Sequence, residues 1–300
     1  MHIRSRRPTV EEVADAPPIY LTDHCQSCRW LTQCQSIAHA EKSVTLLNGI
    51  SRQSWESLIA AGITSAEHIL ERTPEQLIQL KGIGKATVKQ IYASAQALAR
   101  GEAVRLAPIP DEITRPAIML DIETSLNYDE ANQPWSFGWS DLSGTLRNMI
   151  VARFFDGDQL VLPTGQPVDI IPHYLDGWRI LAEYAQAHDA LIYHWSGFDA
   201  SVMQHTAAPE IVSVLAPRMR DFLQVFKTCV MLPVRGRSIK TVAAYLNYAY
   251  PPESNYAQAW NDYQAWRMEN DRDALARAVA YQLADVEAMI VARDWLLRSP

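Results

Sequence analysis

Two carboxylates stand close together at the end of an apolar run, and their spacing suits a metal site. Asp121 and Glu123 follow the run 117–120 and are separated by Ile122. In a strand, residues two apart point to the same face, so we expect both carboxylates on one side. Adjacent anionic oxygens of this kind are ligands that Mg²⁺ and Mn²⁺ prefer. The motif by itself also fits a solvated strand edge or a helix cap.

Two further acidic motifs lie downstream, on expected helices. Asp199 follows Phe198 soon after the apolar run 191–194, at a helix start where the dipole alone would favour an acid. In the last helical segment, Tyr281 and Asp285 are four residues apart and therefore share one helix face. A phenol placed in this way can stand beside a metal-bound carboxylate and its water molecule. Taken alone, the pair also fits an ordinary surface contact.

The order and spacing of these motifs resemble a known family of nucleases. The sequence DIET from residue 121, an aromatic residue before Asp199 and a Tyr-x3-Asp motif on the terminal helix resemble the DEDD superfamily of RNase H-like 3′ to 5′ exonucleases, in its tyrosine subclass. The resemblance covers about residues 116–299. It implies that two divalent ions, Mg²⁺ or Mn²⁺, are held by Asp121, Glu123, Asp199 and Asp285, and that Tyr281 positions or deprotonates the attacking water. The implied activity is two-metal hydrolysis of phosphodiester bonds in single-stranded DNA or RNA.

Two other residues near these motifs concern the substrate. Many members of the family carry Asn four residues before the aromatic residue of the second motif, whereas this chain has His194. The resemblance therefore implies an altered substrate contact at His194. The segment RSIKTV at 237–242 resembles a stretch of predicted RNase H-like domains fused to RecB-like nucleases. This makes Lys240 a candidate phosphate contact, with a solvated helix lysine as the alternative.

A helical region precedes the acidic motifs. Helical spacing predicts short helices at 51–61, 65–71, 74–80 and 85–99. Between the last two, LKGIGK resembles a helix-hairpin-helix motif, and LNGI at 47–50 resembles a weaker second half. Gly82 and Gly84 allow a tight backbone whose exposed amides can receive a phosphate, and Lys81, Lys85 and Lys89 add charge attraction. A module that contacts only protein is the alternative.

Three cysteines are crowded near the start of the chain. The spacing of Cys25, Cys28 and Cys34 resembles the three-cysteine cluster of iron-sulfur RecB-like nucleases. The fourth cysteine of that family lies upstream of the nuclease core, which this chain lacks, so the resemblance implies the back half of such a fusion. The fourth ligand would be His24, Cys229 or a residue of a protein partner. A 4Fe-4S cluster, Zn²⁺ and a metal-free cluster all stay open.

The motifs require a mixed α/β domain to bring them together. Apolar runs at 117–122, 135–139, 149–155 and 191–194 predict strands, and helices are predicted at 174–187 and 271–298. The predicted fold is an α/β RNase H-like mixed sheet flanked by helices, preceded by a small all-α helix-hairpin-helix domain. We expect a cysteine segment at 1–40, the helix-hairpin-helix domain at 41–100, a proline-rich linker at 101–116 and the exonuclease domain at 117–300.

Composition and charge narrow the class of protein. The chain has 300 residues, of which 48% are hydrophobic, enough to bury a substantial core. We expect a cytoplasmic protein, because no apolar run approaches the roughly 20 residues of a membrane span and no secretory signal is recognisable. Residues 1–100 carry a net charge of +2, from 11 basic and 9 acidic residues, and the remainder carries −9, from 16 and 25. An acidic domain can still bind nucleic acid through divalent ions held by its carboxylates.

These observations predict a 3′ to 5′ exonuclease that acts on single strands. A catalytically weak nucleic-acid-binding or scaffolding subunit is the alternative from another class, and a structure-selective endonuclease is a third. The aromatic residues Tyr256, Trp260, Tyr263 and Trp266 have helical spacing. They predict a helix packed on the sheet, with base stacking as the alternative.

Overall fold

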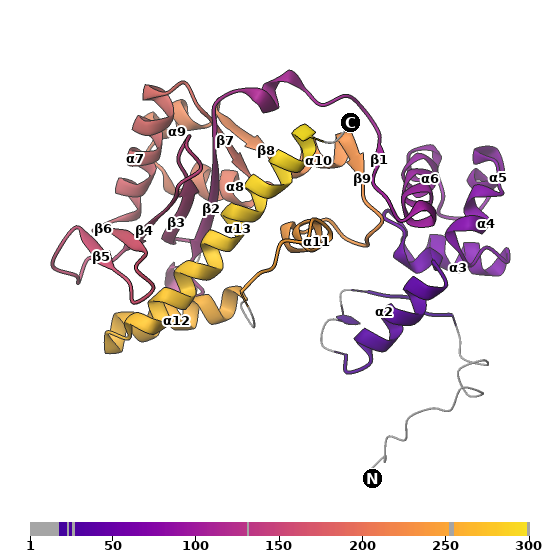
Figure 1. Ribbon diagram of the computed structural model, residues 1–300, viewed down its shortest axis with the longest axis horizontal. Coiled ribbons are helices and arrows are strands. Elements are labelled where there is room, and N and C mark those ends of the chain that lie inside the picture. Colours follow the sequence, from indigo (N-terminus) through magenta and orange to yellow (C-terminus); the bar gives the residue numbers. More distant parts are fainter. Residues whose placement is uncertain (1–17, 23, 26–27, 131, 252–254, 299–300) are drawn as a thin grey trace, which may run out of the picture. The chain divides into compact units, whose positions relative to one another are not determined.

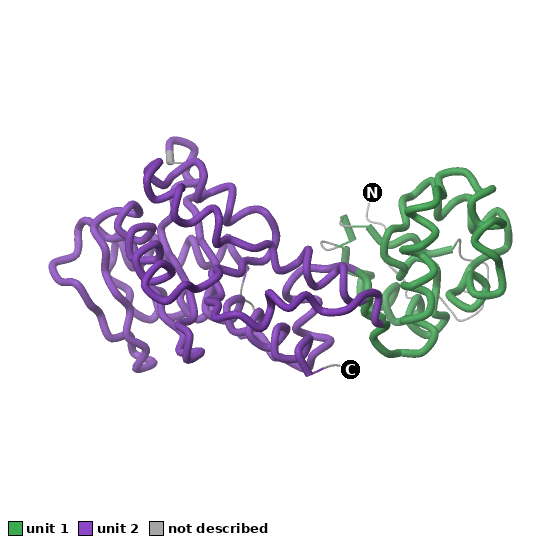
Figure 2. Tube along the Cα trace, turned by 90° about the horizontal axis from the view of Figure 1, so that it is seen from above, with its two compact units in different colours: residues 1–104, 231–235 green, residues 105–230, 236–300 purple. Residues whose placement is uncertain are grey.

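The computed structural model describes residues 18–298, apart from 23, 26, 27, 131 and 252–254. The chain forms two compact units, coloured separately in Figure 2. Unit 1 comprises residues 1–104 and 231–235, and unit 2 comprises 105–230 and 236–300. Unit 1 is helical and unit 2 is a mixed α/β domain, labelled by element in Figure 1. The predicted order of an all-α domain and an α/β domain is therefore confirmed.

Helices build the described part of unit 1, and three of the α-helices begin at a side-chain cap. The helices are α2 (Leu31–Ala40), the 3-10 helix η2 (Val44–Leu46), α3 (Arg52–Ala60), α4 (Ala66–Leu70), α5 (Pro74–Ile78) and α6 (Lys85–Arg100). The side chains of Ser51, Ser65 and Thr73 accept hydrogen bonds from the first turns of α3, α4 and α5. Such caps satisfy backbone N–H groups that a helix leaves without an internal partner. Each of these helices therefore begins at the residue after a Ser or Thr that the sequence supplies.

A seven-stranded sheet forms the centre of unit 2, in the order β5-β6-β4-β3-β2-β7-β8. Its strands are β2 (Ala117–Thr124), β3 (Pro134–Ser140), β4 (Leu146–Val151), β5 (Gln159–Val161), β6 (Pro167–Ile171), β7 (Leu191–His194) and β8 (Met219–Asp221). The central strand β2 pairs antiparallel with β3 and parallel with β7. Asp121 lies opposite Gly138 and Glu123 opposite Ser136 on β3. A separate two-stranded sheet joins β1 (Val104–Arg105) and β9 (Val230–Met231).

Helices cover both faces of this sheet, as the ribbon in Figure 1 shows. They are α7 (Tyr174–Ala187), α8 (Phe198–Thr206), α9 (Pro209–Leu215), α10 (Phe222–Cys229), α11 (Ile239–Tyr245), α12 (Tyr256–Glu269) and α13 (Arg272–Arg298), with 3-10 turns η3 (Asp111–Thr114) and η4 (Tyr128–Glu130). One face packs its apolar side chains, Ile118, Leu120 and Ile122 of β2 among them, against residues of α7, α8 and α9. The other face packs against α12 and α13. Because strand residues alternate, Asp121 and Glu123 are left on the α13 side.

The aromatic residues of α12 pack against the sheet, as the helical spacing predicted. Trp260, Tyr263 and Trp266 are buried in the same core cluster as Trp135 of β3, and Tyr256 is exposed. In the described part of the chain, none of the helices combines the length and apolarity that crossing a bilayer would require.

The third predicted strand was wrong in its limits. It was expected at 149–155, whereas β4 spans Leu146–Val151. The strand starts earlier because the side chain of Asp141 accepts hydrogen bonds from Ser143 and Thr145 and closes a hairpin that pairs Leu146 with Ser140. The apolar residues Phe154 and Phe155 lie beyond its end and contact Trp266 of α12 instead of pairing in the sheet. Apolar character alone thus overestimated the strand at its carboxyl end.

Candidate active site

Three acidic side chains meet between β2 and α13. Asp121 and Glu123 lie on β2, and Asp285 lies on α13. Each contributes one oxygen to a group in which all three oxygens lie within 4.8 Å of one another. Among the residues that the structure describes, no other set of three or more His, Cys, Asp or Glu side chains is this compact. We call Asp121, Glu123 and Asp285 the acidic triad.

The triad carries strong electrostatic repulsion. Burial raises the pKa of Asp121 well above its usual range, and the charges of Asp285, Glu123 and Asp199 raise it further. Burial and the charges of Asp285 and Asp199 raise the pKa of Glu123 to about 8. Burial also raises the pKa of Asp285. Three carboxylates with raised pKa values favour either protons or a cation between them, because either one removes the repulsion.

The oxygens of the triad have the capacity to bind a cation. Oδ2 of Asp121 and Oδ1 of Asp285 are buried, and no hydrogen bond of normal length and angle reaches either atom within the described chain. The nearby hydroxyl of Tyr250 lowers the pKa of Asp285, but it too lacks a hydrogen bond of normal geometry. Buried polar atoms are rarely left in this condition. Anionic oxygens that face one another without protein donors fit Mg²⁺ or Mn²⁺.

The fourth predicted acid, Asp199, lies beside the triad but outside its compact group. It sits at the start of α8, and its Oδ1 accepts a hydrogen bond from the backbone N–H of Ile122 at 2.9 Å. Burial raises the pKa of Asp199 to about 7, against the opposing effect of this hydrogen bond. Its charge in turn raises the pKa values of Asp121 and Glu123. Asp199 is therefore close enough to interact with the triad electrostatically.

His194 is buried at the end of β7, with 2% of its surface exposed. Its Nδ1 donates to the carbonyl of Ser196, a residue in the left-handed region at φ +76°. The same nitrogen lies 4.0 Å from Oδ2 of Asp199. Burial lowers the pKa of His194, so the ring is neutral near pH 7. The imidazole thus supports the turn that carries Asp199, and its role as a substrate contact stays a prediction.

Tyr281 and Lys240 lie together over the triad. Tyr281 is on α13, one turn before Asp285, and is 7% exposed. The ammonium of Lys240, on α11, lies 4.2 Å from the centre of the Tyr281 ring and 5.5 Å from that of Tyr250. Its charge lowers the pKa values of Glu123 and Asp285. Burial and the three carboxylates raise the pKa of Tyr281, so its hydroxyl stays protonated. Lys240 therefore lies at the acidic site instead of in open solvent.

Gln282 is a residue of the site that the sequence reasoning missed. It is fully buried on α13, and its Nε2 donates to the backbone carbonyls of Asp121 at 2.8 Å and Ser136 at 3.2 Å. Its Oε1 accepts from Nδ2 of Asn148 at 2.7 Å and from the hydroxyl of Ser136. A side chain at Gly138 would collide with it, because an added Cβ would lie 2.8 Å from its Cγ. The sequence offered one signal for Gln282: it is a single amide side chain among the apolar residues of the last predicted helix.

Unit 1 contains two similar hairpins, one before α3 and one before α6. Gly49 and Gly82 occupy equivalent places in them, at φ +86° and +80°, a region that favours glycine. The α3 hairpin ends in Ser51, whose side chain forms a capping box. The α6 hairpin ends in Gly84, which provides no side-chain cap. The first N–H groups of α6 thus lack a side-chain acceptor, and Lys81, Lys85 and Lys89 beside them are exposed.

Comparison with known families agrees with this geometry. Residues 118–297 match the RNase_H superfamily. The chain belongs to the RNase H superfamily. The match runs from β2 into α13, so the superfamily domain contains the whole acidic triad as well as Asp199 and Tyr281. Residues 41–97 match the SAM-like helix-hairpin-helix tandem, which includes both glycine hairpins. A search of the curated proteins finds no match. The predicted RNase H-like fold and helix-hairpin-helix domain are confirmed.

The predicted cysteine cluster lies outside the superfamily domain. Cys25, Cys28 and Cys34 carry free thiols, and in the described chain they do not form a group as compact as the acidic triad. Hydrogen bonds from Thr22 lower the pKa of Cys25. Burial and the charges of the other two cysteines raise the pKa of Cys34. Of the candidate fourth ligands, His24 is exposed, and the buried Cys229 of unit 2 donates to the carbonyl of Pro108. Metal binding by these cysteines stays a prediction.

Proposed function

We propose that this member of the RNase H superfamily is a metal-dependent 3′ to 5′ exonuclease that hydrolyses single-stranded DNA or RNA. One observation carries the proposal. One carboxylate oxygen each of Asp121, Glu123 and Asp285 lies within 4.8 Å of the others; Glu123 and Asp285 are buried and Asp121 partly so. No hydrogen bond of normal geometry within the described chain reaches Oδ2 of Asp121 or Oδ1 of Asp285. Carboxylates this close repel one another, and a divalent cation bound between them would turn that repulsion into attraction.

Each residue of the site has a role in this proposal. The acidic triad, with Asp199 as a fourth ligand, holds two Mg²⁺ or Mn²⁺ ions. When bound, such ions activate water and stabilise the charge on the attacking and leaving oxygens of a phosphodiester. Tyr281 stays protonated and orients the attacking water by donating a hydrogen bond. Lys240 moves from the face of Tyr281 to a phosphate oxygen of the substrate. His194 fixes the turn that presents Asp199.

The helix-hairpin-helix tandem supplies affinity for the strand in this proposal. Gly82 and Gly84 bring the backbone of the second hairpin close to a phosphate, and the uncapped first turn of α6 donates N–H groups to it. Lys81 and Lys85 add long-range attraction. The first hairpin has its own capping box at Ser51, so we assign the phosphate contact to the second hairpin.

We further propose that Cys25, Cys28 and Cys34 hold a 4Fe-4S cluster or Zn²⁺, completed by His24, Cys229 or a residue of a protein partner. Their crowding in sequence and the acidified thiol of Cys25 support this. An ultraviolet-visible spectrum of anaerobically purified protein, combined with metal analysis, tests it. Visible absorbance with stoichiometric iron indicates a cluster, and stoichiometric zinc indicates the tetrahedral site. Protein free of both metals contradicts the proposal.

A time course with a labelled strand tests the nuclease proposal. The substrate is a single strand with an internal label and a free or blocked 3′ end, incubated with Mn²⁺. We expect stepwise shortening from the free 3′ end, loss of activity in Asp121→Asn, and strong reduction in Tyr281→Phe. Asp156→Asn, which changes an exposed carboxylate of unit 2, is the matched control. Equal label release by wild type and Asp121→Asn would contradict the enzyme proposal, and cleavage of a circular strand would indicate an endonuclease.

A nucleic-acid-binding subunit with weak or no turnover is the second candidate. The position of Asp199, hydrogen-bonded to Ile122 and outside the compact triad, favours it. In that case wild type and Asp121→Asn bind a labelled strand equally well, and wild type shortens it no faster than the variant.

A further inference from the structure

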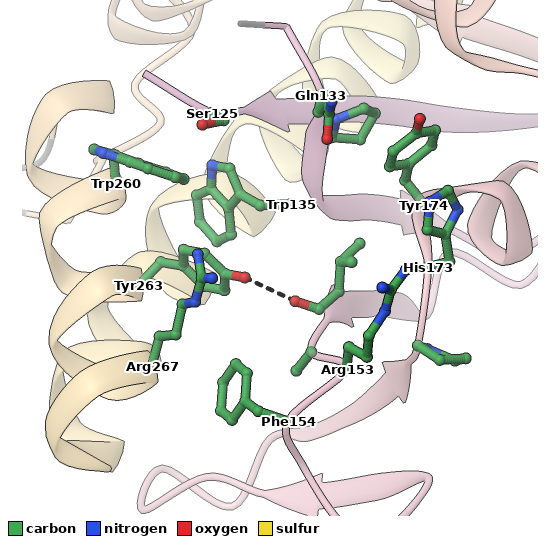
Figure 3. Close-up of a pocket in the computed structure, with 14 residues that line it drawn as sticks. Ser125, Gln133, Trp135, Arg153, Phe154, His173, Tyr174, Trp260, Tyr263 and Arg267 are labelled. Carbon is green, nitrogen blue, oxygen red and sulfur yellow. Dashed lines mark hydrogen bonds between the residues drawn. The ribbon is translucent and has the colours of Figure 1, made fainter. Parts of the chain in front are cut away.

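A cavity of about 360 Å³ opens in unit 2 beyond the carboxyl end of β2. It lies between the ends of the sheet strands, the start of α7 and one face of α12, as Figure 3 shows. Its volume is at the lower end of the range for small-molecule sites. Ser125 lines the cavity and lies two residues beyond Glu123 in the chain.

Aromatic side chains form one wall of the cavity. Trp260 and Tyr263 project from α12 toward Trp135 of β3. The Tyr263 ring stacks on Trp135 with centroids 4.5 Å apart, and its hydroxyl donates to the carbonyl of Val151 at 2.7 Å. Contacts of this kind hold the rings in place before any ligand binds. Trp135, Trp260 and Tyr263 expose only 3%, 7% and 5% of their surface, because most of each ring packs against its neighbours. What remains exposed is a fixed apolar wall, against which a flat ligand can lie at little cost in side-chain entropy.

The charged groups of the cavity are all basic. Arg267 follows Trp260 and Tyr263 on the same face of α12, and Arg153 enters from the segment after β4. Neither guanidinium pairs with a carboxylate anywhere in the described chain, and no Asp or Glu lines the cavity. His173 accepts a hydrogen bond from the N–H of Leu175 through Nδ1, which leaves Nε2 as a donor. In a region of the chain with net charge −9, this lining selects for an anion.

We propose that this cavity binds a nucleoside 5′-monophosphate group, with the base against Trp135, Trp260 and Tyr263 and the phosphate paired with Arg153 and Arg267. The aromatic wall and the unpaired guanidinium groups recognise the two halves of such a ligand. The group belongs either to a free mononucleotide or to a nucleotide within a strand. The choice of a nucleotide over other aromatic anions rests on the proposed nuclease function, but binding itself requires no catalysis.

Calorimetric titration of the full chain with adenosine 5′-monophosphate in EDTA tests the proposal. Adenosine and inorganic phosphate are titrated separately. We expect the monophosphate to bind at least tenfold more tightly than either half, and Arg153→Gln/Arg267→Gln to weaken it at least tenfold. Arg298→Gln, which changes an exposed arginine of α13, should bind like wild type. Circular dichroism verifies that every variant is folded.

The controls separate this site from the nuclease proposal. The titration contains EDTA, so it measures binding without the divalent ions that catalysis would need. If wild type binds the monophosphate here but does not cleave a strand with Mn²⁺, only the proposed nuclease activity is refuted. No binding by wild type, or equal binding by the double arginine variant, overturns the cavity proposal. A single-stranded pentanucleotide identifies the source. Displacement of the monophosphate by the pentanucleotide assigns the site to a strand, and independent binding of the two assigns it to a free mononucleotide.

Discussion

The fold holds three mutually repelling carboxylates close together, those of Asp121, Glu123 and Asp285. Their oxygens lie within 4.8 Å of one another in a largely buried place, where Coulomb repulsion is poorly screened. Protonation relieves the repulsion in the absence of metal, which is the physical meaning of the raised pKa values. Lys240 relieves a smaller part of it from its position over Tyr281. Three kinds of positive charge therefore compete for these carboxylates: protons, the ammonium of Lys240 and metal ions.

The stability of the metal-free protein should fall as pH rises. The folded pKa of Glu123 is about 8 and that of Asp199 about 7, both above the values of the unfolded chain. The folded state thus binds these protons more tightly, and the stabilisation present below pH 4 is lost as pH passes through 7 to 8. One pKa unit corresponds to about 1.4 kcal/mol, so the loss amounts to a few kilocalories per mole. Urea unfolding in EDTA between pH 5 and 8.5 measures it.

Glu123→Gln removes one of the groups with a raised pKa, so the free energy of unfolding of this variant should depend less steeply on pH than that of wild type. Adding Mn²⁺ at pH 8.5 should restore stability to wild type much more than to Glu123→Gln, because metal binding displaces protons. Asp156→Asn, on an exposed loop, should retain the wild-type profile. A metal-free stability that rises from pH 6 to 8.5 would mean that the triad is not repulsive.

Lys240→Gln should slow strand cleavage by about a hundredfold if the ammonium reaches a phosphate, the size of effect found when one donor to a transition-state oxyanion is removed. Lys240→Arg should recover part of the rate, since it keeps the charge. Lys227→Gln, on α10, serves as the matched control. Single-turnover rates at saturating Mn²⁺ measure the effect. A rate within twofold of wild type would return Lys240 to the role of a surface lysine that lies against Tyr281.

At the scale of the element, β2 and α13 do most of the positioning. The alternation of β2 was readable from the sequence because Ile118, Leu120 and Ile122 required one buried face, which left Asp121 and Glu123 on the other. The length and apolar character of α13 were readable as well. What the sequence could not predict is how α13 is fixed on the sheet. That depends on Gln282, whose partners are 134 to 161 residues away in the chain.

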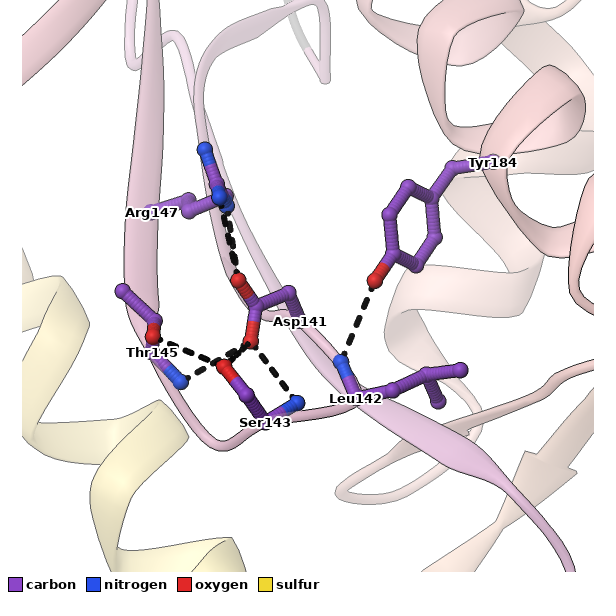
Figure 4. A network of polar contacts seen from close by, with 6 residues as sticks. All are labelled: Asp141, Leu142, Ser143, Thr145, Arg147 and Tyr184. Carbon is purple, nitrogen blue, oxygen red and sulfur yellow. Dashed lines mark hydrogen bonds and ion pairs between the residues drawn. The ribbon is translucent and has the colours of Figure 1, made fainter.

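The hairpin between β3 and β4 shows a second limit at this scale. Asp141 accepts hydrogen bonds from Ser143 and Thr145 and pairs with Arg147, as Figure 4 shows. Burial raises the pKa of Asp141, but these hydrogen bonds outweigh it and hold the pKa below its usual value. The turn fixes the register of β4, so local polar chemistry and not apolar content decided where the strand began. The edge strand β5 and its neighbour β6, of 3 and 5 residues, were missed because they are too short for a periodic pattern.

Gln282→Leu should destabilise the protein by about 3 kcal/mol, because it leaves buried polar partners on β2, β3 and β4 unsatisfied. Gln186→Leu, at an exposed position of α7, should change stability by less than about 0.5 kcal/mol. Urea unfolding followed by circular dichroism gives both values. A loss below 1 kcal/mol for Gln282→Leu would show that the amide network is not what holds α13 to the sheet.

At the scale of the whole molecule, the chain divides its chemistry between an acidic unit and a basic hairpin. The net charge of +2 over residues 1–100 against −9 over the rest anticipated this division. The change from helical spacing to strand runs near residue 101 predicted a domain boundary there, and the two compact units divide between residues 104 and 105. The return of residues 231–235 to unit 1 was not visible, because a segment of five residues has no composition of its own.

The division of charge predicts how binding depends on salt. Changing Lys81, Lys85 and Lys89 together to Gln removes three exposed charges beside the uncapped start of α6. Each phosphate contact on a single strand contributes about 0.7 to the slope of log affinity against log salt. We therefore expect the slope to decrease in magnitude by about 2 and affinity at 50 mM salt to fall at least tenfold. Fluorescence anisotropy with a labelled strand in EDTA measures both.

Arg52, Arg72 and Arg100, changed together to Gln, provide the control, since they lie in the same unit and also carry three charges. If the second hairpin receives the phosphate, the lysine variant alone loses the salt-dependent part of binding. Equal losses in the two variants would mean that unit 1 attracts nucleic acid only through its total charge. An unchanged slope in the lysine variant would instead favour a hairpin that contacts protein. If the hairpin bound a phosphate, removing the three charges beside it would have to change the salt dependence of binding.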